Sequence, residues 1–130
     1  MNIERLTAIL REAAATEIMP RFRRLDEGAI RTKSHAHDLV TEADEASERF
    51  ITEAIKAASP QTVVIGEEAV AANPKLLDTH FENETVVYVD PVDGTWNFAA
   101  GLPLFAVMAA VVHKGEVVAG VITIRWGMTG

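Results

Sequence analysis

Two aspartates beside a tight turn are the residues of this sequence best suited to chemistry. Asp90 and Asp93 lie in the run VDPVDGT at positions 89–95, directly after a β-branched and aromatic segment. Pro91 restricts the backbone and Gly94 permits a tight turn, so both carboxylates can point into one small space. Like charges that close are tolerable mainly when a cation lies between them. The run therefore predicts a cation site at a strand end, and an exposed Asp-Gly turn is the alternative.

The backbone beyond this turn is suited to holding an anion. The N–H groups of Gly94 and Thr95 are predicted to be free at the start of a short helix, which is a natural cradle for phosphate. Trp96 and Phe98 are interpreted as packing residues that hold the turn in place. The chain has a net charge of −7, so it would need bound cations to handle a phosphate ester.

A second acidic motif follows another predicted strand, at residues 62–65. If that strand lies near the segment 85–89, Glu67 joins Asp90 and Asp93 in one acidic cluster. Oxygen ligands with no Cys in the chain suit Mg²⁺ rather than zinc or copper. The alternative is that Glu67 and Glu68 are a solvated helix start.

Asp44 has two interpretations. The spacing Thr41-x-x-Asp44 has the form of a helix capping box, and a capped helix start is also a rigid mount for a catalytic carboxylate. In the preceding segment, His35 and His37 favour a solvated loop over a metal site. Lys33 is predicted to be solvated, with a contact to phosphate as the alternative.

Composition limits the classes of protein. With 130 residues, 48% of them hydrophobic, the sequence predicts a single domain over residues 1–130. Its acidic balance argues against a nucleic-acid partner, which needs a clustered basic face. The N-terminus lacks the pattern of a signal peptide, and the apolar stretch 102–112 contains Pro103 and is too short to span a membrane. We therefore expect a cytoplasmic protein that is not membrane-bound.

The pattern of apolar residues predicts the elements that position these groups. Helical periodicity covers residues 3–19, ending at Pro20, and a second helix runs from Thr41 to Ala58. The residues between these helices read as a loop. The remaining expected elements are strands at 62–65 and 85–89, a helical turn at 74–77 and a hairpin of 104–112 with 116–124. The expected fold is α+β or layered α/β, with two N-terminal helices packed on a mostly antiparallel sheet.

Three ordered motifs resemble the inositol monophosphatase family, which belongs to a lithium-sensitive phosphatase superfamily. The strongest is the strand followed by DPVDGTWNF at residues 90–98. The run GEE at residues 66–68 is similar to the family's upstream acidic motif, and Lys33-Ser34 followed by DLVTEAD at residues 38–44 is similar to an earlier segment. The likeness extends from about Lys33 to Thr123.

The resemblance implies a magnesium-dependent phosphomonoesterase. By it, the side chains of Glu67, Asp90 and Asp93 and the backbone carbonyl of Val92 would coordinate Mg²⁺. Glu68 would support the waters on the metal.

It also implies how water and phosphate are handled. Thr95 together with Asp44 would position and deprotonate the attacking water, and the amides of Gly94 and Thr95 would hold phosphate oxygens. The expected substrate is inositol monophosphate or another small phosphorylated metabolite. Nucleotide 3′-phosphates, sugar bisphosphates and histidinol phosphate are the alternatives within the class.

The sequence departs from the family in length. Family members have a later Trp-Asp motif, whose aspartate completes the second metal site of their αβαβα sandwich. Here the last tryptophan, Trp126, is followed by Gly127. We therefore expect an N-terminal part of the fold with poor activity on its own, and a truncated, non-catalytic metal-binding or interaction remnant is the alternative. An uncovered sheet edge would favour association, for instance as a homodimer.

Overall fold

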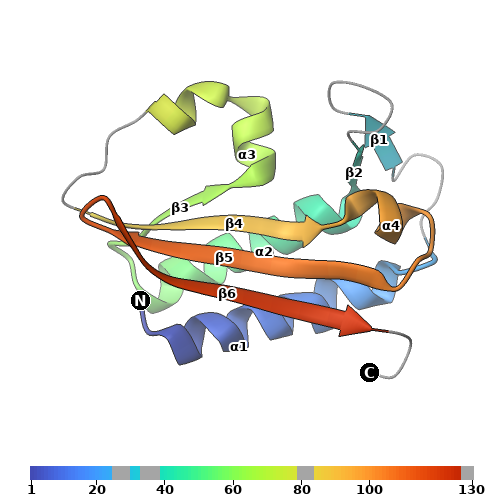
Figure 1. Ribbon diagram of the computed structural model, residues 1–130, viewed down its shortest axis with the longest axis horizontal. Coiled ribbons are helices and arrows are strands. Elements are labelled where there is room, and N and C mark those ends of the chain that lie inside the picture. The colour runs from blue at the N-terminus through green and yellow to red at the C-terminus, as the bar shows by residue number, and fades with distance from the viewer. Residues whose placement is uncertain (25–29, 33–38, 79–83, 127–130) are drawn as a thin grey trace.

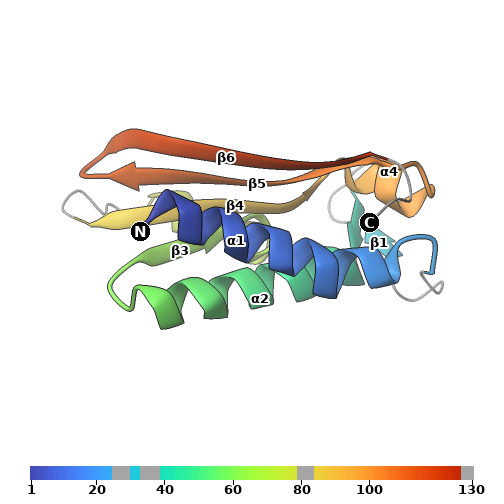
Figure 2. The ribbon, with the colours of Figure 1, turned by 90° about the horizontal axis from the view of Figure 1, so that it is seen from below.

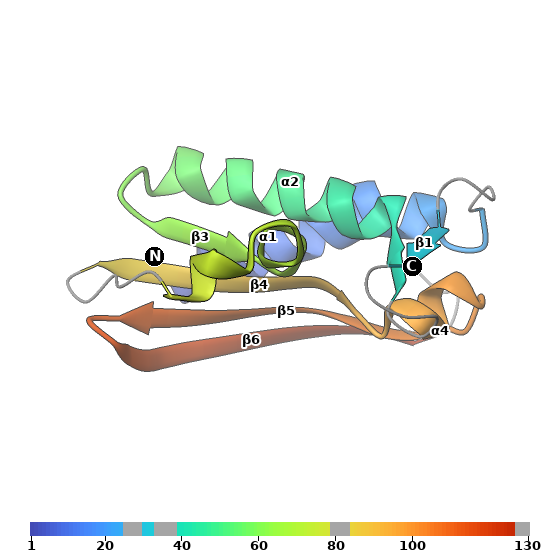
Figure 3. The same ribbon diagram turned by 90° about the horizontal axis from the view of Figure 1, so that it is seen from above.

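Two helices cover one face of a four-stranded sheet in the structure, a computed structural model that describes residues 1–24, 30–32, 39–78 and 84–126 (Figure 1). The sheet order is β3-β4-β5-β6; β3 runs parallel to β4, and the other two pairs are antiparallel. Figures 2 and 3 show both helices on the same side of the sheet. The bounds are α1 (Ile3–Ala13), α2 (Glu42–Ala58), β3 (Val63–Gly66), β4 (Thr85–Asp93), β5 (Leu104–His113) and β6 (Glu116–Trp126). The expected fold of helices on a mostly antiparallel sheet is confirmed.

The first helix follows the predicted amphipathic pattern. The side chain of Asn2 caps α1 by accepting hydrogen bonds from the backbone N–H groups of Glu4 and Arg5. The helix continues as a π-helical turn, η1 (Ala14–Ile18), and a 3-10 turn, η2 (Met19–Arg21). Pro20 cannot donate a backbone hydrogen bond, and the helical path ends one residue after it, at Arg21.

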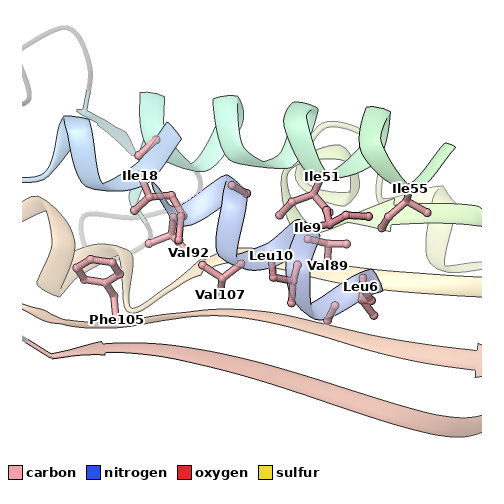
Figure 4. Packing of buried hydrophobic residues seen from close by; sticks show 14 of the residues in the cluster. Leu6, Ile9, Leu10, Ile18, Ile51, Ile55, Val89, Val92, Phe105 and Val107 are labelled. Atoms are coloured by element: carbon pink, nitrogen blue, oxygen red, sulfur yellow. The ribbon is translucent and has the colours of Figure 1, made fainter. Parts of the chain in front are cut away.

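The core lies between the helices and the sheet, with apolar side chains of α1 and α2 pointing at those of β4 and β5 (Figure 4). Every second residue of β5 from Phe105 to Val111 belongs to the core, which is the alternation expected of a sheet with one covered face. An aromatic cluster lies at one end of this core, with ring centroids of Phe98 and Phe105 5.1 Å apart and Phe22 beside both. This packing anchors the chain that follows the predicted turn.

Four expectations about local structure need correction. The segment predicted as a loop contains the strand β1 (Ile30–Thr32), which pairs antiparallel with β2 (Leu39–Thr41). The helix α3 (Glu67–Ala72) begins at Glu67, as the alternative interpretation of that motif had it, and continues through residues 69–72, where no element was predicted; the 3-10 turn η4 (Pro74–Asp78) follows, where a helical turn was expected. β4 continues to Asp93, past the predicted end at residue 89. Phe98 is buried as expected, whereas Trp96 packs only in part, with 49% of its surface exposed.

Within the part of the chain that the structure describes, no helix combines the length and apolar character needed to cross a bilayer.

Candidate active site

Strand register brings the two acidic motifs together. β3 and β4 pair in parallel, with Gly66 opposite Val89. The residues that follow this pair, Glu67 at the start of α3 and Asp90 in β4, therefore lie near one another at the same end of the sheet. The carboxyl ends of parallel strands are where such sheets place their ligands. Glu67 and Asp90 share a side-chain hydrogen bond, although Glu67 is largely exposed.

A β-bulge in β4 decides how Asp90 and Asp93 are oriented. Asp90 pairs with Met108 of β5 and Asp93 pairs with Ala106, so three steps along β4 match two steps along β5. In a regular strand, residues three apart point to opposite faces of the sheet. The extra residue restores the phase, which allows both aspartates to face the side away from α1 and α2. Pro91, with no N–H to donate, suits this interruption of the ladder.

The turn after the bulge starts the short helix α4 (Thr95–Ala99). Gly94 has φ of +91°, in the left-handed region that favours glycine, and a Cβ there would lie 3.1 Å from the carbonyl oxygen of Leu104. Among the described residues, no side chain caps the N-terminus of α4. The amides of Gly94 and Thr95 therefore stand at the helix start, as predicted.

Thr95 connects this turn to α2. Its Oγ1 lies 2.8 Å from Asp44 Oδ1 and 2.9 Å from the carbonyl oxygen of Val92, and it can donate its proton to one of them at a time. Oδ2 of Asp44 accepts hydrogen bonds from the N–H of Thr41 at 2.9 Å and from its hydroxyl at 2.6 Å. The predicted capping box is confirmed, and Asp44 is fully buried. One carboxylate oxygen thus holds the helix start while the other contacts Thr95.

The surroundings of Asp90 oppose the ionisation of its carboxyl group. Burial, its hydrogen bond with Glu67 and the charges of Glu67, Asp93 and Asp44 together raise the pKa of Asp90 to about 8. Within the described chain, its Oδ1 is buried without a hydrogen-bond partner. A bound cation would give Asp90 Oδ1 a partner and would reduce the repulsion between the carboxylates. These oxygen ligands therefore fit a hard divalent ion such as Mg²⁺.

The predicted three-carboxylate cluster is only partly assembled. The described residues contain no group of three or more His, Cys, Asp or Glu side chains arranged to hold a metal ion. Asp93 is exposed, yet it lies close enough to raise the pKa of Asp90. The proton shared by Glu67 and Asp90 relieves the same repulsion that a cation would, so proton and cation compete for this place. The assignment of Glu67, Asp90, Asp93 and Val92 as metal ligands stays a prediction.

Sequence reasoning missed Glu48. Its carboxylate accepts hydrogen bonds from the N–H groups of Glu68 and Ala69, at 2.8 and 3.1 Å. The backbone of Glu68 is thus held by α2, while the predicted role of its side chain stays a prediction. The signal in the sequence was the position of Glu48 one helical turn after Asp44. Lys33, His35 and His37 lie outside the described residues.

Two hollows open beside these groups on the outer face of the sheet. One of about 590 Å³ is lined by Glu67, Asp90 and Tyr88, and a second of about 410 Å³ by Asp93, Gly94 and Asn97. Met108 and Ile122 line both hollows. Each hollow has one of the two aspartates in its lining, and the rest of each lining is largely apolar.

Known proteins are similar to this chain in sequence and in fold. Inositol monophosphatase 1 of Sus scrofa is 45% identical over 87 residues, which cover 66% of this chain and 30% of that protein. Nus factor SuhB of Pasteurella multocida is 37% identical over 109 residues, covering 84% of this chain and 38% of that protein. The solved structure of an inositol monophosphatase (IMPase) of Thermotoga maritima superposes with a TM-score of 0.76 at 30% identity, covering 94% of this chain and 43% of that chain.

The extent of these matches is uneven. The chain spans only 30% and 38% of the length of the two curated relatives. Over its own length the likeness is nearly complete, because residues 2–124 match the family described as the inositol monophosphatase family. The chain belongs to the inositol monophosphatase family.

Proposed function

We propose that the protein is a magnesium-dependent phosphomonoesterase that hydrolyses inositol monophosphate or a related small phosphate ester. The observation that carries this proposal is the hydrogen bond between Thr95 and Asp44, which links α4 to α2 beside the Glu67–Asp90 pair. It joins a hydroxyl and a buried carboxylate next to an acidic pair that favours a cation. Family membership supports a phosphatase in general.

Oxygen atoms of four residues would hold magnesium: the carboxylates of Glu67, Asp90 and Asp93 and the backbone carbonyl of Val92. Bound magnesium supplies positive charge and lowers the pKa of a coordinated water. The Val92 carbonyl oxygen lies 2.9 Å from Thr95 Oγ1, and when the hydroxyl donates to Asp44 this oxygen keeps its lone pairs for another partner. The bulge between Asp90 and Asp93 supports this shared role, because it lets the two carboxylates face one side of the sheet.

Thr95 and Asp44 would orient the attacking water and take its proton. Both hydrogen bonds to Oδ2 of Asp44 come from Thr41, so Oδ1 is the oxygen directed at the reacting group. A water that donates to Thr95 Oγ1 lets the hydroxyl pass its own proton to Asp44 Oδ1. The capping box prevents Asp44 from turning away, which keeps the acceptor in place.

The phosphate would be held by backbone rather than by basic side chains. The amides of Gly94 and Thr95 stand at the N-terminus of α4, where N–H groups and the local dipole attract an anion. In a chain of net charge −7, these amides and the bound cation would provide the positive potential that a phosphate ester requires. Glu68 would add a hydrogen-bond acceptor for waters at the metal.

The choice of substrate within the class rests on the relatives. The pig relative is named an inositol monophosphatase, which favours inositol monophosphate. A Thermotoga maritima relative is named a fructose-1,6-bisphosphatase/inositol-1-monophosphatase, which keeps sugar bisphosphates as an alternative beside nucleotide 3′-phosphates and histidinol phosphate. A third relative carries the name of a Nus factor, so the expectation of no nucleic-acid partner stays a prediction that rests on the acidic charge. A cytoplasmic location, inhibition by lithium and a homodimer also stay predictions.

A second candidate function is cation binding without turnover. The incomplete grouping of carboxylates among the described residues disfavours turnover, which keeps this candidate open. The two are separated by phosphate release from a panel of phosphomonoesters at increasing Mg²⁺, with and without lithium. We expect release that requires Mg²⁺, that is greatest with inositol monophosphate and that is poor from the 130-residue chain on its own. Mg²⁺ binding with no release from any ester would leave the second function.

A further inference from the structure

Helix α2 carries a second carboxylate that contacts the acidic motif after β3. Glu48 lies one turn after Asp44, and its two oxygens accept from consecutive amides, Glu68 N at 2.8 Å and Ala69 N at 3.1 Å. Hydrogen bonds to an ionised acceptor are about twice as strong as neutral ones. These two bonds satisfy N–H groups at the start of α3 that have no partner within the helix itself.

The same carboxylate packs against the residue before Glu67. Gly66 is buried, and a Cβ added to it would overlap the carboxyl group of Glu48. The missing side chain at position 66 therefore makes room for the carboxylate. Glu48 contacts the chain on both sides of Glu67, through Gly66 before it and the amide of Glu68 after it.

We propose that Glu48 is a positioning residue that holds Glu67 against Asp90 and so sets the affinity of the site for divalent cations. The inference rests on the proposed function, because it assigns Glu67 a place at the cation. It follows from one relationship: Asp44 and Glu48, four residues apart on α2, hold Thr95 and the Glu67 turn respectively. A single rigid helix thereby determines the distance between two segments that are far apart in the chain.

The chemistry of the contact requires a glutamate. Each of the two N–H donors meets its own carboxylate oxygen here, whereas glutamine offers one oxygen and an amide group that would meet the second N–H donor to donor. Aspartate is one methylene shorter and would not reach both amides without movement of the backbone. Loss of the contact would leave Glu67 attached to a less constrained turn.

The test compares Glu48→Gln and Gly66→Ala with the control Glu53→Gln, which makes the same charge change at an exposed position of α2. Mg²⁺ affinity is measured by calorimetry, and phosphate release is measured against Mg²⁺ concentration. Loss of a residue that orients a metal ligand typically weakens metal affinity by about 10- to 100-fold. We expect both variants to need at least about tenfold more Mg²⁺, with kcat at saturating Mg²⁺ within about threefold of wild type, and the control to be unchanged.

The outcomes separate this inference from the function on which it rests. Wild type that binds no Mg²⁺ overturns both. If both variants bind Mg²⁺ as tightly as wild type, the inference is overturned and the proposed function is not. A fall in kcat that saturating Mg²⁺ fails to restore has the same consequence. If the variants do not fold, amide hydrogen exchange in the wild-type protein decides. Slow exchange at Glu68 and Ala69 without Mg²⁺ supports a preformed contact, and exchange as fast as in an exposed turn overturns it.

Discussion

The hydroxyl of Thr95 lies 2.8 Å from Oδ1 of Asp44, joining residues 51 positions apart in the chain. The contact is possible because α4 begins where β4 ends and α2 begins beside it, at the capping box of Thr41. A hydroxyl beside a fixed carboxylate is suited to moving a proton. Because Thr95 and Asp44 lie beside the Glu67–Asp90 pair, substitutions at these residues should separate the proton transfer from cation binding.

Replacing Thr95 should affect turnover more than Mg²⁺ affinity. Thr95→Val keeps the shape and removes the hydroxyl, and general-base contributions are about 10²- to 10⁴-fold, so kcat should fall by at least about 100-fold. Thr95→Ser keeps the hydroxyl and should stay within about tenfold of wild type, an estimate that follows from its retained proton path. Phosphate release and Mg²⁺ calorimetry on the pair provide the measurement. Equal activity of the valine and serine variants would contradict the proton role.

Replacing Asp90 by Asn should abolish phosphate release and stabilise the cation-free protein. The substitution removes a predicted ligand and also a carboxyl group whose ionisation is opposed by burial and by Glu67, Asp93 and Asp44. We expect no measurable turnover, a higher melting temperature in EDTA and a smaller rise of that temperature on adding Mg²⁺. Glu53→Gln is the matched control, since it removes one negative charge from an exposed site. Wild-type turnover by Asp90→Asn would refute the site assignment.

The cation-free protein should lose stability as the pH rises from about 4 to about 8. The pKa of Asp90 is raised from 3.8 to about 8, so over that interval the folded state holds one more proton than the unfolded state. The free energy of unfolding therefore falls with rising pH across that interval and levels off above it. Denaturant melts in EDTA at several pH values measure this slope. In Asp90→Asn the contribution of this group should be absent.

Mg²⁺ binding near neutral pH should release about one proton, because the cation displaces the proton shared by Glu67 and Asp90. Calorimetric titrations in two buffers with different ionisation enthalpies count the protons released. The count should approach zero well above pH 8. A binding heat that is the same in both buffers at pH 7 would show that no proton is displaced.

Removing the Thr41 hydroxyl should weaken the whole arrangement through the helix start. Thr41→Val deletes two hydrogen bonds at the capping box, one of them the 2.6 Å bond to Asp44. Loss of such a cap costs about 0.5–2 kcal/mol of unfolding free energy. Thr41→Ser, which keeps the hydroxyl, should recover most of that loss in a urea melt. Similar stability of the two variants would indicate that the hydroxyl contributes little.

Local patterns were sufficient for most of the elements and for some of the contacts. The apolar stripe predicted α2, the threonine-aspartate spacing predicted its capping box, and the β-branched runs predicted β3, β4 and the β5–β6 hairpin. Each of these features depends on residues that lie close together in the sequence. The strand β1 was missed because its three residues form a pair with β2 and carry no periodicity of their own.

The sequence alone, through the types and order of its residues, determined the family and identified the acidic and hydroxyl groups that could take part in the reaction. Only the tertiary structure decided that Gly66 pairs with Val89, that a bulge separates Asp90 from Asp93, and that Glu48 contacts the turn after β3. The physical reason is that strand register and packing between distant segments depend on the whole core. A shift of one residue in that register would turn the same carboxylates to the other face of the sheet.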